Sequence, residues 1–292
     1  MNGEGGRAGG RAALLLSALA FSVVALPPEL SAQSMRTFTA TKGFEPIPAL
    51  AVAVEFGAGH LELGPNTAGQ LYHVDFRYDQ ERSAPEHQYD AQAHRLALRL
   101  RPIGNAGVRV TNRDQLAQDA AITLSPSVPL ALDVTLGAGE GELELGGMKL
   151  RTAAIHSLAS RTIIRASHPN LMTCETLDLD GGAAEVITEH LGNLRCAEIR
   201  FDGGVGATTL DLTGRWSSTL RVRAKQALGN LQLVLPKDAG VRIVLDRTLT
   251  TFTPVGFVPD GTAWVTPNFR SAARTIQIDI TTAVGGIEVR WE

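Results

Sequence analysis

Histidine and carboxylate side chains are the residues in this sequence that could bind a metal ion or transfer a proton. No pair of histidines has the H-E-x-x-H spacing with which a helix binds zinc. Glu189-His190 follows His168 by one period of the repeat described below and could form a weak metal site together with Glu185. We favour histidines in solvent-facing loops, because a proline follows His168 and Leu-Gly follows His190. The sequence therefore predicts no metal site and no cofactor.

Aspartates beside glycines are a second pattern that could bind an ion. Asp178 and Asp180 precede one Gly-Gly pair, and Asp202 precedes another. Calcium-binding repeat toxins need a nine-residue period with aspartate inside the glycine loop, and the interval here is much longer. We therefore interpret these side chains as exposed carboxylates beside turns.

Catalytic arrangements are scarce. Glycoside hydrolysis needs two carboxyl groups that face each other, whereas Asp133, Asp178 and Arg200 recur at equivalent places of successive segments and predict an exposed ladder of charges. No G-x-S-x-G motif and no phosphate-binding P-loop occurs. The glycines of residues 137–141 precede another strand pattern, so the helix of a dinucleotide-binding fingerprint is missing. We predict that the protein is not an enzyme, with a polysaccharide-active enzyme as the catalytic alternative.

The elements that carry these residues repeat along the chain. Segments with apolar residues at every second position begin at Leu132, Ile155, Leu177, Ile199 and Leu220, at intervals of 23, 22, 22 and 21 residues. Alternation of this kind is typical of a half-buried strand. An interval this constant indicates a repeat architecture. We call each repeat a rung.

Glycines recur at one place of the rung, just after its first strand. Glycine reaches positive φ without a steric penalty, so a recurrent glycine marks a corner that the backbone turns in every rung. Each rung is therefore predicted to be a strand, a glycine corner, a second strand and a polar return. The predicted corner glycines are Gly57, Gly59, Gly137, Gly139, Gly181, Gly182, Gly203, Gly204, Gly206, Gly229, Gly285 and Gly286.

A single rung cannot fold alone, because two short strands do not offset an ordering entropy of about 1 to 2 kcal/mol per residue. Stacked rungs pair their backbones and share one apolar column. The sequence therefore predicts an all-β, β-helix-like solenoid made of a single stack of rungs of about 22 residues. We expect residues 33–118 to form an N-terminal strand cap and residues 119–292 the rungs, together one continuous elongated unit. An aromatic-bearing segment, residues 246–275, is expected to close the far end.

Cys174 and Cys196 are the two cysteines, and they are separated by one rung. The predicted stack makes them neighbours in adjacent rungs. A disulfide is geometrically possible at that separation of strands. Two buried thiols in the core are the alternative, and the sequence leaves the choice open.

The start of the chain, residues 1–32, has the layout of a signal peptide. Arg7 and Arg11 precede an apolar run over residues 12–26, and the small residue Ala32 precedes the expected cleavage point. An uncleaved anchor is the alternative, but the run is shorter than the ~20 residues that cross a bilayer. We expect residues 1–32 to be removed and the protein to be exported to the periplasm or the cell surface, with no membrane span after cleavage.

Charge argues against nucleic acid as a partner. The chain has 27 Lys and Arg against 30 Asp and Glu, a formal net charge of -3. Nucleic-acid binders usually carry a basic stripe, and no such stripe occurs here.

Glycine corners with their alternating strands also carry a resemblance to a known family. The segments are LDVTLGAGEGELELGGMKL from residue 132, LGNLQLVLPKDAGVRI over 228–243 and the closing FRSAARTIQIDITTAVGGIEV. Over roughly residues 50–290 the chain resembles the bacterial toast-rack domains found in adhesin families and in LiaF-type proteins of the cell-envelope stress response. The resemblance implies an extracytoplasmic stacked β architecture without an established catalytic site. The chain lacks the transmembrane helices of LiaF-type proteins.

Three functions follow as hypotheses. We expect an exported, non-enzymatic envelope or surface module, adhesin-like, whose strand faces bind an envelope polymer or an envelope protein. A soluble regulator of envelope-stress signalling, acting through a membrane-protein partner, is the first alternative. A polysaccharide-active β-helix enzyme is the second.

Overall fold

The computed structural model describes residues 34–103, 117–216 and 219–292. The predicted signal peptide, residues 1–32, lies outside the described residues. Contacts divide the chain into Met1–Ala32 and a compact unit, Gln33–Glu292, and only the second is described below. Its described residues form strands and one short 3-10 helix, η2 (Leu191–Leu194). The prediction of an all-β fold is confirmed.

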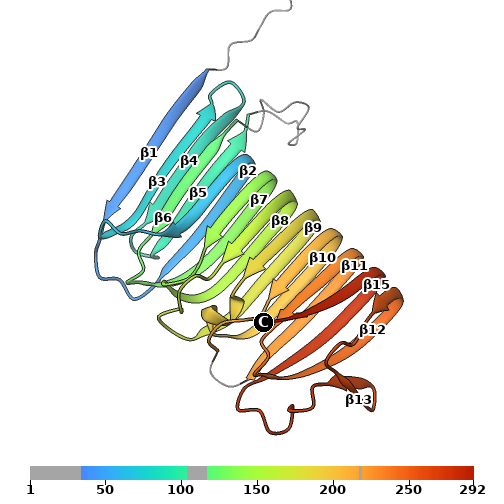
Figure 1. Ribbon diagram of the computed structural model, residues 1–292. Coiled ribbons are helices and arrows are strands. Elements are labelled where there is room, and N and C mark those ends of the chain that lie inside the picture. The colour runs from blue at the N-terminus through green and yellow to red at the C-terminus, as the bar shows by residue number, and fades with distance from the viewer. Residues whose placement is uncertain (1–33, 104–116, 217–218) are drawn as a thin grey trace, which may run out of the picture. The chain divides into compact units, whose positions relative to one another are not determined.

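The strands fall into long, bent ones and short, single ones (Figure 1). The long ones are β2 (Leu50–Pro65), β7 (Pro129–Glu144), β8 (Lys149–Arg165), β9 (Cys174–Glu189), β10 (Cys196–Asp211), β11 (Thr219–Leu235), β12 (Gly240–Phe252) and β15 (Thr275–Trp291). The others are β1 (Met35–Gly43), β3 (Gln70–Asp79), β4 (Ser83–Asp90), β5 (Arg95–Pro102), β6 (Asp119–Leu124), β13 (Val258–Asp260) and β14 (Ala263–Val265).

The long strands are parallel and lie in the order β2-β7-β8-β9-β10-β11-β15-β12 (Figure 1). Each is one rung, and equivalent positions of successive rungs pair directly. Leu177 of β9, for example, pairs with Ile199 of β10, which pairs with Val222 of β11. The predicted parallel stack is confirmed.

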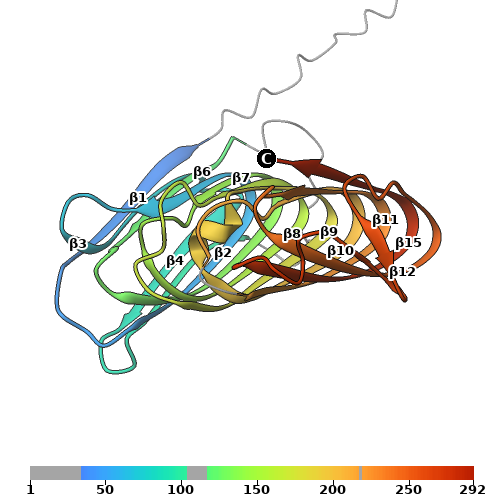
Figure 2. The ribbon, with the colours of Figure 1, turned by 60° about the horizontal axis from the view of Figure 1, so that its bottom comes forward.

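Every rung bends at its corner into two halves, and the corner contains glycine in β2, β7, β9, β10, β11 and β15 but not in β8 or β12. The first half of β2 pairs with β5 and its second half with β6, while β7 runs beside both halves. The halves therefore form two half-sheets, the first before the corner and the second after it. Viewed closer to the direction of the stack, the rungs appear as nested arcs (Figure 2).

The core lies between the two half-sheets. Leu177, Ile199, Val222, Ile278 and Ile243 pair in sequence across five rungs, and each is at most 1% exposed. Burying a side chain of this size stabilises the fold by about 1.5 to 3 kcal/mol. Columns of this kind hold the stack together, because a rung without neighbours would be unprotected on both of the sides where the adjacent rungs lie.

The two ends of the stack differ from its middle. At the N-terminal end β4 and β5 extend the first half-sheet, and β6, β3 and β1 extend the second, partly with antiparallel pairing. At the other end β14 and β13 follow β12 in the first half-sheet. Phe252 of β12 packs edge-on against Trp264 of β14, with ring centroids 6.1 Å apart.

The last strand in sequence is not the last in space. β15 lies between β11 and β12, so the chain passes its future position, makes β12, β13 and β14, and returns. In this place β15 pairs on both sides, so its backbone hydrogen bonds are satisfied, and its isoleucines at 276, 278 and 280 are buried.

Candidate functional site

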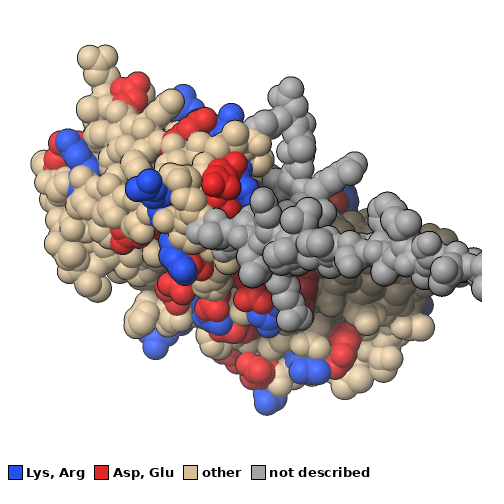
Figure 3. Space-filling view, turned by 90° about the horizontal axis from the view of Figure 1, so that it is seen from above, with Lys and Arg blue, Asp and Glu red and all other residues tan. Residues whose placement is uncertain are grey.

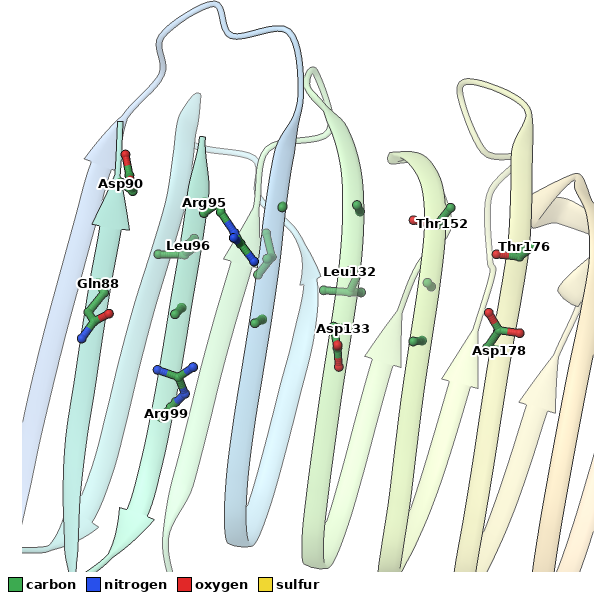
Figure 4. Close-up of a pocket in the computed structure, with 17 residues that line it drawn as sticks. Gln88, Asp90, Arg95, Leu96, Arg99, Leu132, Asp133, Thr152, Thr176 and Asp178 are labelled. Atoms are coloured by element: carbon green, nitrogen blue, oxygen red, sulfur yellow. The ribbon is translucent and has the colours of Figure 1, made fainter. Parts of the chain in front are cut away.

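A hollow of about 610 Å³ lies on the outer surface of the first half-sheet, over strands β4, β5, β2, β7, β8 and β9 (Figure 4). Outward-facing residues alternate with core residues along each strand, so the register decides which side chains surround it. An adjoining hollow of about 410 Å³ shares Ala53 and Asp133 with the first and continues toward the corner at Gly57 and Gly137.

Small side chains form the floor of this hollow. Ala51 of β2 pairs with Ala131 of β7, and Ala53 lies between Ala97 of β5 and Asp133 of β7. Ala154 of β8 follows Asp133 in the same row. Because an alanine adds only one methyl group to the surface, these rows leave a depression between strands whose other outward residues are long.

Arginines line one wall. Arg95, on β5, is exposed and forms no ion pair among the described residues. Asp90 is its strand-pair partner, but Oδ1 of Asp90 accepts hydrogen bonds from the backbone N–H groups of Ala93 and Gln92, each at 2.9 Å. Those hydrogen bonds lower the pKa of Asp90, and the positive charge of Arg95 also lowers it. Figure 4 shows the Arg95 side chain directed from β5 toward β2 and Asp90 pointing away from it.

The next arginines along β5 are already paired. Arg99 lies 2.9 Å from Glu55 and 3.7 Å from Glu86, and Arg101 lies 3.0 Å from Glu55. The hydrogen bond from Arg99 holds the pKa of Glu55 below its usual value. This cluster bounds the hollow toward the corner and leaves Arg95 as the arginine of its lining without a carboxylate partner among the described residues.

Aspartates line the opposite wall. Asp133 Oδ1 lies 3.8 Å from the ring nitrogen Nε2 of His156, whose other ring nitrogen lies 2.7 Å from Asp180. Asp178 is held by Arg200 at 3.2 Å. The hollow therefore has a guanidinium available for a ligand on one side and a carboxylate with a histidine neighbour on the other.

The charged residues that the sequence predicted to form a ladder lie at equivalent positions of successive rungs. Asp133, Ala154, Asp178 and Arg200 pair in sequence across four rungs, so their equivalence is confirmed. Asp202 lies 3.7 Å from Lys225 in the next rung. Figure 3 shows acidic and basic side chains interspersed over one face. Asp133 and Asp178 line the same hollow, so two carboxylates of the ladder do come together at one site. The sequence pattern did not indicate this.

The carboxylates of the weak metal site that the sequence analysis disfavoured are paired with arginines. Glu185 lies 3.0 Å from Arg161, and Glu189 lies 3.1 Å from Arg165. The ring of His190 makes a 2.8 Å hydrogen bond with Thr213. In the three ranges that the structure describes, no group of three or more His, Cys, Asp or Glu side chains could hold a metal ion.

The glycine corners form two ladders along the stack. In the first, Gly206, Gly229 and Gly285 pair in sequence with φ of +148°, +133° and +144°. A Cβ on Gly229 would lie 1.7 Å from the carbonyl oxygen of Gly206. Gly59 and Gly139 continue this ladder with positive φ at the N-terminal rungs. The second ladder contains Gly57, Gly137, Gly182 and Gly204, and beside the two ladders lie Gly181, Gly203 and Gly286.

Cys174 and Cys196 are strand partners in adjacent rungs and are joined by a disulfide. They are 0% and 5% exposed. A bridge between cysteines with a sequence separation of 22 stabilises a fold by about 3 kcal/mol in the chain-entropy description. It therefore ties two rungs in the middle of the stack.

An apolar ridge runs along the corners of the C-terminal rungs. Val205, Leu228, Val284 and Leu249 pair in sequence from β10 to β12, and they are 52%, 49%, 43% and 73% exposed. Three of them have glycine as a neighbour in the sequence. Because glycine has no side chain, these apolar side chains project beyond their neighbours at the corner.

Comparison with solved structures gives weak likeness over most of the chain. A "putative cell adhesion protein" from Clostridium sporogenes is 15% identical, with a TM-score of 0.45, covering 88% of this chain and 100% of that one. "Putative adhesin" structures from Bacteroides fragilis and Parabacteroides merdae are 13% and 12% identical, with TM-scores of 0.36 and 0.34. Both cover 88% of this chain, and 98% and 96% of their own.

None of the curated proteins matches this chain. Among protein families, the one described as the N-terminal domain of toast_rack, DUF2154, matches residues 33–188, which is more than half of the 292 residues. These residues run from β1 to the second half of β9 and include every residue of the alanine floor. The chain belongs to this toast-rack family.

Proposed function

We propose that this protein is an exported, non-enzymatic module of the cell envelope or surface that binds an extended envelope polymer or an envelope protein. The observation that carries the proposal is the alanine-floored hollow between Arg95 and Asp133 on the outer surface of the first half-sheet. A floor of methyl groups with charged walls admits a chain lying flat on the strands and orients it by its polar groups.

Ion pairing favours binding over catalysis at this surface. General acid and base catalysts need carboxylates free to exchange protons with a substrate. In the lining of the hollow Asp178 is held by Arg200, and beside the hollow Glu55 and Glu86 are held by Arg99. These ion pairs fix the shape of the surface and leave Arg95 and Asp133 as the charged groups that a ligand can contact.

Export is supported by two features. The disulfide between Cys174 and Cys196 belongs to the kind of bond that persists in oxidising compartments outside the cytoplasm. The signal-peptide layout of residues 1–32 supplies the route. Within the described ranges, no helix has the length and apolar character needed to cross a membrane.

Co-sedimentation with intact peptidoglycan sacculi and with envelope fractions tests this proposal. The protein is expected to pellet with one of these fractions at moderate salt. Ala53→Trp fills the floor without changing a charge or a core residue and is expected to reduce pelleting at least about tenfold, a loss of about 1.4 kcal/mol. Thr281→Trp is the matched control, because Thr281 faces outward on the same half-sheet beyond the hollow and is expected to pellet normally.

Equal pelleting of Ala53→Trp and wild type would contradict a role for the hollow. Absence of pelleting with every fraction would contradict the proposed function. Pelleting with envelope fractions but not with sacculi, unchanged in Ala53→Trp, would favour the second candidate, a regulator that binds a membrane-protein partner. The observation in favour of that candidate is the ridge of Val205, Leu228, Val284 and Leu249, since contiguous exposed apolar residues are typical of protein interaction sites.

A further inference from the structure

We infer that the hollow recognises a short peptide segment that carries both a free carboxylate and a free ammonium group. The carboxylate binds Arg95 and the ammonium group binds Asp133. This inference rests on the proposed function, and it names the class of ligand that the same hollow takes.

The carboxylate is assigned to Arg95 by elimination among the cations of the lining. Arg99 already pairs with Glu55 and Glu86, at 2.9 and 3.7 Å. Arg95 is exposed, has no ion pair among the described residues, lines the hollow and points toward β2 (Figure 4). A guanidinium presents a planar pair of N–H donors that matches both oxygens of a carboxylate.

The ammonium group is assigned to Asp133 by the same comparison among the anions. Asp90 accepts two backbone N–H groups of its own turn, and Asp178 is paired with Arg200. Asp133 has a side chain 62% exposed, and the ring nitrogen Nε2 of His156 lies 3.8 Å from its Oδ1. The oxygens of this carboxylate are therefore accessible to the three N–H donors of an ammonium group.

The separation of the two groups sets the length of the ligand. Arg95 and Asp133 lie on strands separated by β2, which places their backbones roughly 10 Å apart across the sheet and about 7 Å apart along it. Both side chains lie on the face that carries Ala51 and Ala53. Both side chains shorten this separation, so a ligand of two or three extended residues, at about 3.3 to 3.6 Å per residue, has the length to reach both charged groups.

The floor selects peptide over sugar. Sugar rings and bases are commonly held on aromatic faces, and no aromatic side chain is among the described residues that line the hollow. Methyl groups of Ala51, Ala53, Ala97, Ala131 and Ala154 instead accept a narrow backbone with small side chains.

The inference is tested by measuring, with titration calorimetry or NMR, the binding of trialanine and of its two blocked forms, N-acetyl-trialanine and trialanine amide. Wild type is expected to bind trialanine at least about tenfold more tightly than N-acetyl-trialanine or trialanine amide, because each block removes one charge-assisted contact. Arg95→Gln is expected to bind trialanine and the amide equally while still preferring the free amine. Asp133→Asn is expected to show the reverse pattern.

Arg221→Gln is the matched control, since Arg221 is exposed on the outer surface of the same half-sheet and does not line the hollow, and it is expected to keep both preferences. Equal binding of all three peptides by wild type, or no binding at millimolar concentration, would overturn the inference. If sacculi pelleting is still lost in Ala53→Trp, such a result would leave the hollow as a binding site for a different ligand. If Ala53→Trp pellets normally, the proposed function fails independently of the peptide results.

Discussion

Gly229→Ala is expected to destabilise the protein by at least about 3 kcal/mol in urea unfolding. The glycine has φ of +133°, a conformation that L side chains rarely adopt. The added Cβ would also lie 1.7 Å from the carbonyl oxygen of Gly206 in the adjacent rung. Both rungs would have to separate at the corner, which weakens the pairing on either side.

Gly261→Ala is the matched control for this prediction. Gly261 also has positive φ, +64°, but a Cβ there would meet nothing within 4 Å. The substitution is expected to cost about 1 kcal/mol, which is the cost of the backbone conformation alone. Equal losses at the two positions would show that the close stacking of corner glycines does not limit the fold.

Val222→Asp is expected to prevent folding, whereas Arg223→Asp is expected to be tolerated. Val222 is 1% exposed and lies in the central core column, where an unpaired carboxylate costs several kcal/mol out of a total stability of about 5 to 15 kcal/mol. Arg223 is the next residue and faces the opposite side of β11. Its replacement by Asp removes a surface ion pair with Glu198, worth at most about 1 kcal/mol, and places a carboxylate beside Glu198 and opposite Asp279, a repulsion of similar size at an exposed site. Circular dichroism and solubility of the two variants measure the difference.

The pair tests the register of the whole stack, because the two positions differ by one residue. A shift of one residue would exchange the buried and exposed sides of every strand. Similar tolerance of both substitutions would therefore contradict the assignment of faces. Leu177→Asp and Leu212→Asp are expected to behave as Val222→Asp does, and Arg215→Asp as Arg223→Asp does, since both leucines are 0% exposed and Arg215 is exposed.

The stack could be predicted from the sequence because its causes are local and repeated. Alternation from Leu177, Ile199 and Leu220 gives the buried face of each strand, and the nearly constant interval between them gives the pairing of equivalent positions. The same interval made Cys174 and Cys196 neighbours. It could not decide between a disulfide and two thiols, because that choice depends on the direction of the two side chains.

The order of strands at the C-terminal end could not be predicted in this way. The repeat implies that each rung adds to the one before it, and Ile276–Trp291 has the pattern of a final rung. The structure instead inserts β15 between β11 and β12. The choice depends on which neighbour covers the buried isoleucines better, and that is a property of the assembled core.

The hollow was missed for a related reason. Ala97, Ala53 and Ala154 are far apart in the sequence, and an isolated alanine in a strand gives no signal of a site. They come into one row only through the pairing of β5, β2, β7 and β8, including a β5 that belongs to the N-terminal cap. The outward alanines of A-V-A-V at 51–54, together with R-L-A-L-R at 95–99, were the available signal.

The central claim is that the alanine-floored hollow is the binding surface. The most direct test is to record NMR spectra of the alanine methyl groups while peptide-bearing fragments of digested sacculi are titrated into the protein. We predict that the resonances of Ala51, Ala53, Ala97, Ala131 and Ala154 shift together and saturate with one affinity. The methyl group of Ala207, on the outer surface of the second half-sheet, is predicted to stay unchanged. Shifts confined to Ala207 and its neighbours, or no shifts at the floor, would contradict the claim.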